Sequence, residues 1–134
     1  MNRMLPPSAA EASAYIAGLV AEYPNIREVW LFGSRANGSA KPESDWDFLA
    51  FADEATLAAL RGDSRFRRDG IDLLIVTDNE RFEAPWNNGT HLKSGNLSKD
   101  WQWRTVSPTK ATYQAAKGDF DPKERSAERV CLRE

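Results

Sequence analysis

Three aspartates and a Gly-Ser pair are the residues of this sequence whose types and spacing can carry chemistry. Gly33 and Ser34 follow an apolar run, and after ten further residues Asp45 and Asp47 open a second apolar run. Asp72 stands near the head of a third apolar run. Side chains two positions apart in a strand point to the same face, so Asp45 and Asp47 would project together if this run is a strand.

Converging carboxylates define the chemistry that these residues predict. Three of them in one place repel one another unless a cation neutralises them. Oxygen ligands of this kind suit Mg²⁺ or Mn²⁺, which complete their coordination with water and substrate phosphates. Two such ions about 3.5–4 Å apart activate an attacking oxygen and stabilise a leaving pyrophosphate. Gly33 allows close backbone approach, and Ser34 offers a hydroxyl and an N–H group to an anion.

Each of these pieces also has a purely structural explanation. A Gly-Ser pair after a strand is often a turn, an Asp-x-Asp at a strand entrance is often solvated, and Asp72 alone could be one exposed residue on a buried strand. The conjunction is more specific than its parts. Its order is strand, Gly-Ser, ten residues, Asp-x-Asp, strand, helix, and a further strand with an acidic residue near its start.

This order and spacing resemble the nucleotidyltransferase superfamily related to DNA polymerase β, and within it the small stand-alone minimal nucleotidyltransferases. The resemblance covers residues 29–76 and rests on the segments 32–38, 44–48 and 71–73. It implies an α/β (α+β) fold with a small mixed β-sheet flanked by helices, arranged like the polymerase β palm.

The resemblance also implies roles for the matching residues. Contact with a nucleoside triphosphate such as ATP is implied for Gly33, Ser34 and Arg35. Ligation of Mg²⁺ or Mn²⁺ is implied for Asp45, Asp47 and Asp72, and Asp72 is alternatively the base that activates the acceptor hydroxyl.

Helical and strand patterns supply the elements that must position these residues. Ser8 and Glu11 form a capping box ahead of a helix with one apolar face, which Pro24 ends. Asp53 is predicted to cap a second helix. The remaining predicted elements of this half are strands at 26–32, 45–52 and 71–76, a short helix and loop at 35–44, and the second helix at 54–61.

The C-terminal part departs from the minimal family pattern, and no acceptor-binding module is recognisable in it. The alternation at 101–106 predicts a strand whose Trp101 and Trp103 share a face and pack against the sheet. Ser107-Pro108 predicts a helix start, and the Asp-Pro at 121–122 predicts a closing helix that contains Ala127, Val130 and Cys131.

Length and composition limit the number of domains and the classes of partner that this chain can have. The 134 residues predict a single nucleotidyltransferase-like domain over 1–134, with its core at about 8–78 and a C-terminal extension of strand and helices at 79–134. A net charge of -2 gives no general attraction to nucleic acid, so a nucleic-acid acceptor is not indicated by charge. The single cysteine, Cys131, excludes an internal disulfide framework. No run approaches the ~20 apolar residues of a membrane span, and we expect a cytoplasmic protein without a membrane partner.

Three functions remain open at this stage. The first is a metal-dependent nucleotidyltransferase that moves a nucleoside monophosphate from an NTP to an acceptor hydroxyl and releases pyrophosphate. The second is a non-catalytic, antitoxin-like interaction protein of a toxin–antitoxin pair. The third is a nucleotide-binding sensor that never transfers. An open acceptor side fits either a protein partner subunit or a homodimer.

Overall fold

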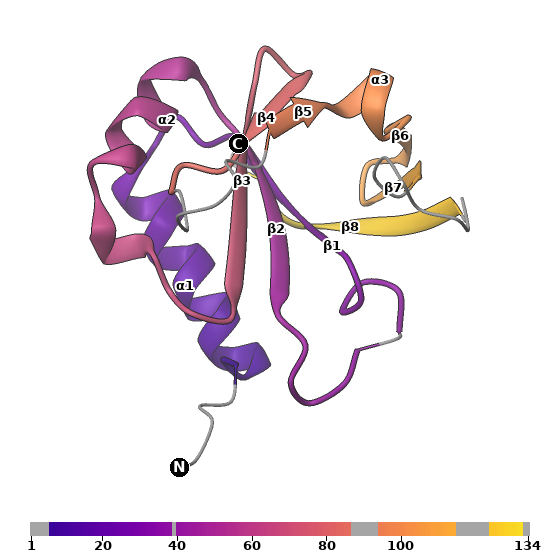
Figure 1. The fold of residues 1–134 in the computed structure, drawn as a ribbon, viewed down its shortest axis with the longest axis horizontal. Helices are drawn as coiled ribbons and strands as arrows, with labels where there is room; N and C mark the ends of the chain where they lie inside the picture. The colour runs from indigo at the N-terminus through magenta and orange to yellow at the C-terminus, as the bar shows by residue number, and fades with distance from the viewer. Residues whose placement is uncertain (1–5, 39, 87–93, 115–123, 133–134) are drawn as a thin grey trace.

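The computed structural model describes residues 6–38, 40–86, 94–114 and 124–132. It is a mixed α+β structure in which one curled, eight-stranded sheet runs through the whole molecule (Figure 1). The elements in chain order are α1 (Ala9–Glu22), β1 (Glu28–Phe32), β2 (Trp46–Phe51), α2 (Glu54–Arg61), the 3₁₀ helix η1 (Ser64–Phe66), β3 (Ile71–Thr77), β4 (Arg81–Glu83), β5 (Ser94–Asn96), α3 (Leu97–Asp100), β6 (Arg104–Ser107), β7 (Lys110–Gln114) and β8 (Glu124–Leu132).

Local capping chemistry sets the two longer helices. The Ser8 hydroxyl accepts the N–H of Glu11, whose carboxylate accepts the N–H of Ser8 in return, so the predicted capping box is confirmed. The carboxylate of Asp53 accepts the N–H of Thr56 at the start of α2, as predicted. The three N-terminal strands also lie within two residues of their predicted bounds.

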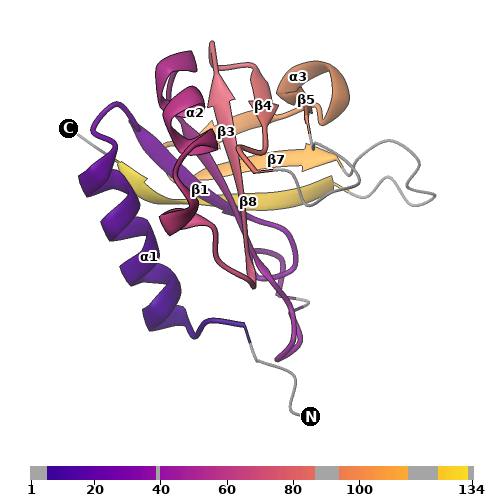
Figure 2. The same cartoon turned by 60° about the vertical axis from the view of Figure 1, so that its left-hand side comes forward.

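Strand order explains how the two halves of the chain combine. The sheet runs β5-β4-β3-β2-β1-β8-β7-β6, and among the described strands only β2 and β3 pair in parallel. Because β8 pairs with the free side of β1, the C-terminal part completes the central sheet. Figure 2 shows the resulting curl, in which β7 and β8 cross behind the N-terminal strands.

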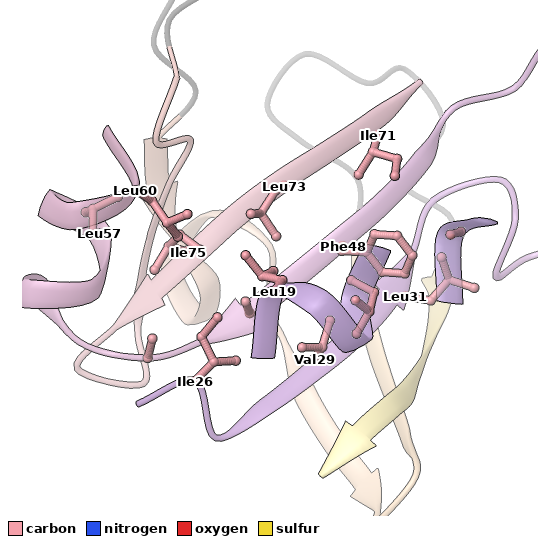
Figure 3. Packing of buried hydrophobic residues seen from close by; sticks show 14 residues of the cluster. Leu19, Ile26, Val29, Leu31, Phe48, Leu57, Leu60, Ile71, Leu73 and Ile75 are labelled. Atoms are coloured by element: carbon pink, nitrogen blue, oxygen red, sulfur yellow. The ribbon is translucent and has the colours of Figure 1, made fainter. Parts of the chain in front are cut away.

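Two apolar clusters cover the two faces of this sheet. Helices α1 and α2 pack on the first face through residues such as Leu19 and Leu60, which contact the sheet around Val29 and Ile75 (Figure 3). The second cluster lies on the opposite face and is closed by the curl of the C-terminal strands and by α3. Its members are Trp30, Leu49, Phe51, Leu74, Val76, Phe82, Leu97, Trp101, Ala111, Tyr113 and Ala127.

The predictions of two helices in the C-terminal part are wrong, because the described residues there form the strands β7 and β8. The segment after Ser107 turns back as β7, and the Ser107 hydroxyl accepts the N–H groups of Thr109 and Lys110 in the hairpin turn. An N-cap serine accepts backbone N–H groups in the same way, so Ser107-Pro108 is compatible with both a helix start and a hairpin turn. The residues around Ala127 form β8, while the Asp-Pro signal at 121–122 lies outside the described residues.

Two smaller expectations are also corrected. The predicted short helix at 35–44 is a set of turns in its described residues, because the single turn that starts at Gly33 is ended by Gly38, whose φ is +72°. The strand predicted from residue 101 begins at Arg104, since α3 ends at Asp100 and Trp101 is its C-cap residue. The packing of Trp101 is confirmed: its ring lies 4.6 Å from that of Phe82.

Leu19→Ala is expected to lower the free energy of unfolding by about 3 kcal/mol, because it removes a fully buried side chain where α1 meets the sheet. Urea denaturation followed by circular dichroism measures the change. Leu132→Ala is the control, since Leu132 is 49% exposed and its substitution should cost less than about 1 kcal/mol. Equal losses in the two variants would contradict the assignment of the core.

None of the helices in the described part of the chain is long and apolar enough to cross a membrane.

Candidate functional site

Asp47 and Asp72 lie directly opposite each other on the two parallel strands. The register of β2 and β3 pairs their Cα atoms. Leu49 and Leu74, two positions further along each strand, belong to the second cluster. Since side chains alternate, both carboxylates lie on that same face, which is the face away from α1 and α2. The sequence separation of 25 residues is therefore closed by strand pairing.

Asp45 lies one residue before β2 and lines a cavity of about 230 Å³ together with Asp72. The cavity also has Arg67 and Arg68 in its wall. Arg68 pairs with Glu11 of α1 at 2.9 Å. Two of the three predicted carboxylates thus share one hollow, in which two arginines provide the opposite charge.

Gly33 fits against the carboxylate of Asp47. It follows β1, whose last residue, Phe32, pairs with Asp47 in the antiparallel register. A Cβ atom at Gly33 would lie 2.1 Å from Asp47 Oδ2, and its φ of +77° is itself a conformation that favours glycine. The glycine is therefore required for the turn and for the close approach of Asp47.

Ser34 and Arg35 lie in the turn that follows. The carbonyl of Ser34 accepts the N–H of Asn37 at 3.2 Å. Arg35 donates from Nη2 to the carbonyl of Ser44 at 2.7 Å, and its guanidinium lies 4.4 Å from the centre of the Trp46 ring. These contacts join the two ends of the segment between β1 and β2. The guanidinium is held by the protein itself, and its predicted contact with a triphosphate stays a prediction.

The carboxylates of Asp47 and Asp72 are ligands of the type that a hard divalent cation would require. In the part of the chain that the structure describes, no three His, Cys, Asp or Glu side chains are grouped closely enough to hold a metal ion by themselves. Mg²⁺ is commonly held by one or two carboxylates and completed by water and substrate phosphates. The opposed pair Asp47 and Asp72 supplies two carboxylates of that kind.

Tyr113 is the residue that sequence reasoning missed. Its hydroxyl oxygen accepts the N–H of Gly33 at 2.8 Å. Burial raises the pKa of this phenol above its ordinary value. Sequence reasoning missed Tyr113 because it predicted a helix for this segment. The alternation of buried Ala111 and Tyr113 with more exposed neighbours is the pattern of a strand.

Comparisons with known proteins give a family match and a similar structure. Residues 15–66 match the family model described as polymerase beta, nucleotidyltransferase. That range contains Gly33, Ser34, Asp45 and Asp47 but ends before Asp72. One similar crystal structure is that of a "putative nucleotidyltransferase" from Sulfolobus solfataricus, with 22% identity, a TM-score of 0.42, and coverage of 64% of this chain and 75% of the other. No curated protein matches the sequence.

Proposed function

We propose that this chain, whose residues 15–66 form part of a polymerase β-like nucleotidyltransferase domain, transfers a nucleoside monophosphate from an NTP to an acceptor hydroxyl. The observation that carries the proposal is the opposition of Asp47 and Asp72, with Gly33 packed on the Asp47 carboxylate. A Gly-Ser turn beside a carboxylate pair offers phosphate and metal contacts within one short span.

The proposed roles follow from where each side chain lies. Asp47 and Asp72, with Asp45, would hold Mg²⁺ or Mn²⁺. When bound, such an ion offsets the charge of the carboxylates and of the phosphates. Ser34 would orient the triphosphate through its hydroxyl and N–H group.

The transfer itself is a substitution at the α-phosphorus. The acceptor oxygen forms a bond to that phosphorus as the bond to the pyrophosphate oxygen breaks. The acceptor proton goes to Asp72 if that carboxylate serves as base, and otherwise to water. Pyrophosphate leaves with the electron pair of the broken bond.

An interaction role is the second candidate, because β8 leaves apolar side chains uncovered. Val130 is 45% exposed and Leu132 is 49% exposed. Such residues suit a partner subunit or a second copy of the chain, as an antitoxin-like protein would require. In that role the carboxylate pair would have no chemical purpose, whereas a transferase needs it.

Isothermal titration calorimetry is expected to show ATP binding by the wild-type protein in the presence of Mg²⁺, and a loss of about tenfold or more in affinity without Mg²⁺. In the Asp45→Asn/Asp47→Asn double variant, Mg²⁺ should no longer increase the affinity for ATP. GTP, CTP and UTP are titrated in the same way to identify the base.

Absence of binding for all four triphosphates at millimolar concentration would contradict the transferase and the sensor alike, and would favour the interaction role. Binding that is unaffected by the double variant would contradict the assigned metal ligands. Release of pyrophosphate, measured with a coupled assay, separates a transferase from a sensor that binds and never transfers.

A further inference from the structure

The Gly33 turn is tied to the C-terminal sheet by a hydroxyl that is distant in sequence. Tyr113 lies 80 residues from Gly33 and accepts its N–H at 2.8 Å. The ring of Tyr113 is fixed on several sides: its centroid lies 5.4 Å from that of Trp101 and 6.0 Å from that of Phe32. Tyr113 is only 5% exposed, so its hydroxyl cannot move without disturbing the second cluster.

A second set of hydrogen bonds holds the other end of the same turn. The side-chain amide of Asn37 donates to the carbonyl of Gly33 at 2.8 Å and to the carbonyl of Ser126 in β8 at 3.1 Å. The N–H of Ser126 donates to Asn37 Oδ1 at 2.8 Å. The turn is thus attached to β7 through one residue and to β8 through another.

These attachments matter because there is no free space between Gly33 and the carboxylate of Asp47. Asp47 Oδ2 lies where even a methyl group at Gly33 would collide with it. A small shift of the turn would move it onto the carboxylate or away from it. Catalytic groups must hold their positions to within a fraction of an ångström, and misplacement of about 1 Å costs on the order of 100-fold in rate.

We propose that Tyr113 is a positioning residue of the nucleotide site, whose hydroxyl holds the Gly33–Ser34 turn in place beside Asp47. This inference rests on the proposed function, and it changes the role of Gly33 in phosphate binding. The Gly33 N–H is satisfied by the protein, so the phosphate contacts of the turn fall to Ser34. Through Tyr113 of β7, the C-terminal strands would contribute to a site whose other residues lie in the N-terminal half.

Tyr113→Phe removes only the hydroxyl and is expected to weaken binding of ATP with Mg²⁺ by about tenfold, as the loss of one hydrogen bond that orders the turn would do. Tyr15→Phe is the matched control. Tyr15 is a partly buried tyrosine, packed against the first cluster on the other face of the sheet, and its hydroxyl donates to the backbone carbonyl of Phe66 at 2.6 Å. It should leave nucleotide affinity unchanged.

Two further readouts separate positioning from general stability. Hydrogen exchange of the Gly33 amide, followed by NMR without nucleotide, should speed up by about tenfold in Tyr113→Phe and stay unchanged in Tyr15→Phe. In steady-state transfer, KM for the nucleotide should rise in Tyr113→Phe. A purely structural loss would instead lower kcat by reducing the active fraction, with KM unchanged.

Affinity in Tyr113→Phe that equals the wild-type value would overturn the inference and leave the proposed function standing. Tighter binding would also overturn it, because the hydroxyl would then be competing with phosphate for the Gly33 N–H. A wild-type protein that binds no triphosphate would overturn the proposed function and this inference with it, whatever the amide exchange shows.

Discussion

Asp47→Asn is expected to reduce nucleotidyl transfer by on the order of 100- to 1000-fold while the protein stays folded. Asp47 is the carboxylate that faces Asp72 across the parallel strands and packs on Gly33. An amide keeps the shape of the side chain but removes the charge that a divalent cation requires. Release of pyrophosphate in the presence of ATP, Mg²⁺ and an acceptor measures the effect.

The same change should not destabilise the metal-free protein. Like charges that lie directly opposite each other on adjacent strands repel, so Asp47→Asn relieves a repulsion with Asp72. The midpoint of thermal unfolding without Mg²⁺ should therefore stay equal or rise. Asp78→Asn is the control for the substitution itself, because Asp78 lies exposed in the turn between β3 and β4. Full transfer activity in a well-folded Asp47→Asn protein would contradict the proposed mechanism.

Gly33→Ala is expected to reduce transfer by on the order of 100-fold, and Gly38→Ala is expected to have little effect on it. Both glycines have positive φ, at +77° and +72°, so both substitutions cost about 1 kcal/mol of backbone strain. Only at Gly33 does the new methyl group meet another atom, 2.1 Å from Asp47 Oδ2, whereas nothing lies within 4 Å at Gly38. The carboxylate must then move out of place.

The pair of glycine variants separates strain from geometry. Thermal unfolding of both proteins measures the strain that they share, and pyrophosphate release measures the loss specific to Gly33. Similar activities in the two variants would show that the contact between Gly33 and Asp47 has no catalytic role.

The N-terminal half could be predicted because its signals are local. The capping box at Ser8 and the cap at Asp53 fix two helices through hydrogen bonds that span three residues. The three apolar runs are too short for helices and become strands that are buried on both faces. The i, i+2 spacing predicted one strand for Asp45 and Asp47, and the structure places Asp47 in β2 and Asp45 one residue before it. The match of residues 15–66 agrees with the predicted resemblance to polymerase β-like nucleotidyltransferases.

The tertiary structure decided the C-terminal half and the surroundings of the site. The residues of β8 carry helix-like spacing of Ala127 and Cys131, yet they form a strand because β1 and β7 offer hydrogen-bonding partners on both sides. Local propensity amounts to tenths of a kcal/mol per residue, which two strand ladders easily exceed.

The contact between Tyr113 and Gly33 has the same origin. No local pattern around either residue predicts this contact. The two residues meet because β8 pairs with β1 on one side and with β7 on the other, which brings Tyr113 of β7 to the turn after β1. Residue types and short spacings therefore determined which groups can do chemistry. Their distances, and the partners that hold them, follow from strand order, which depends on contacts between segments far apart in the chain.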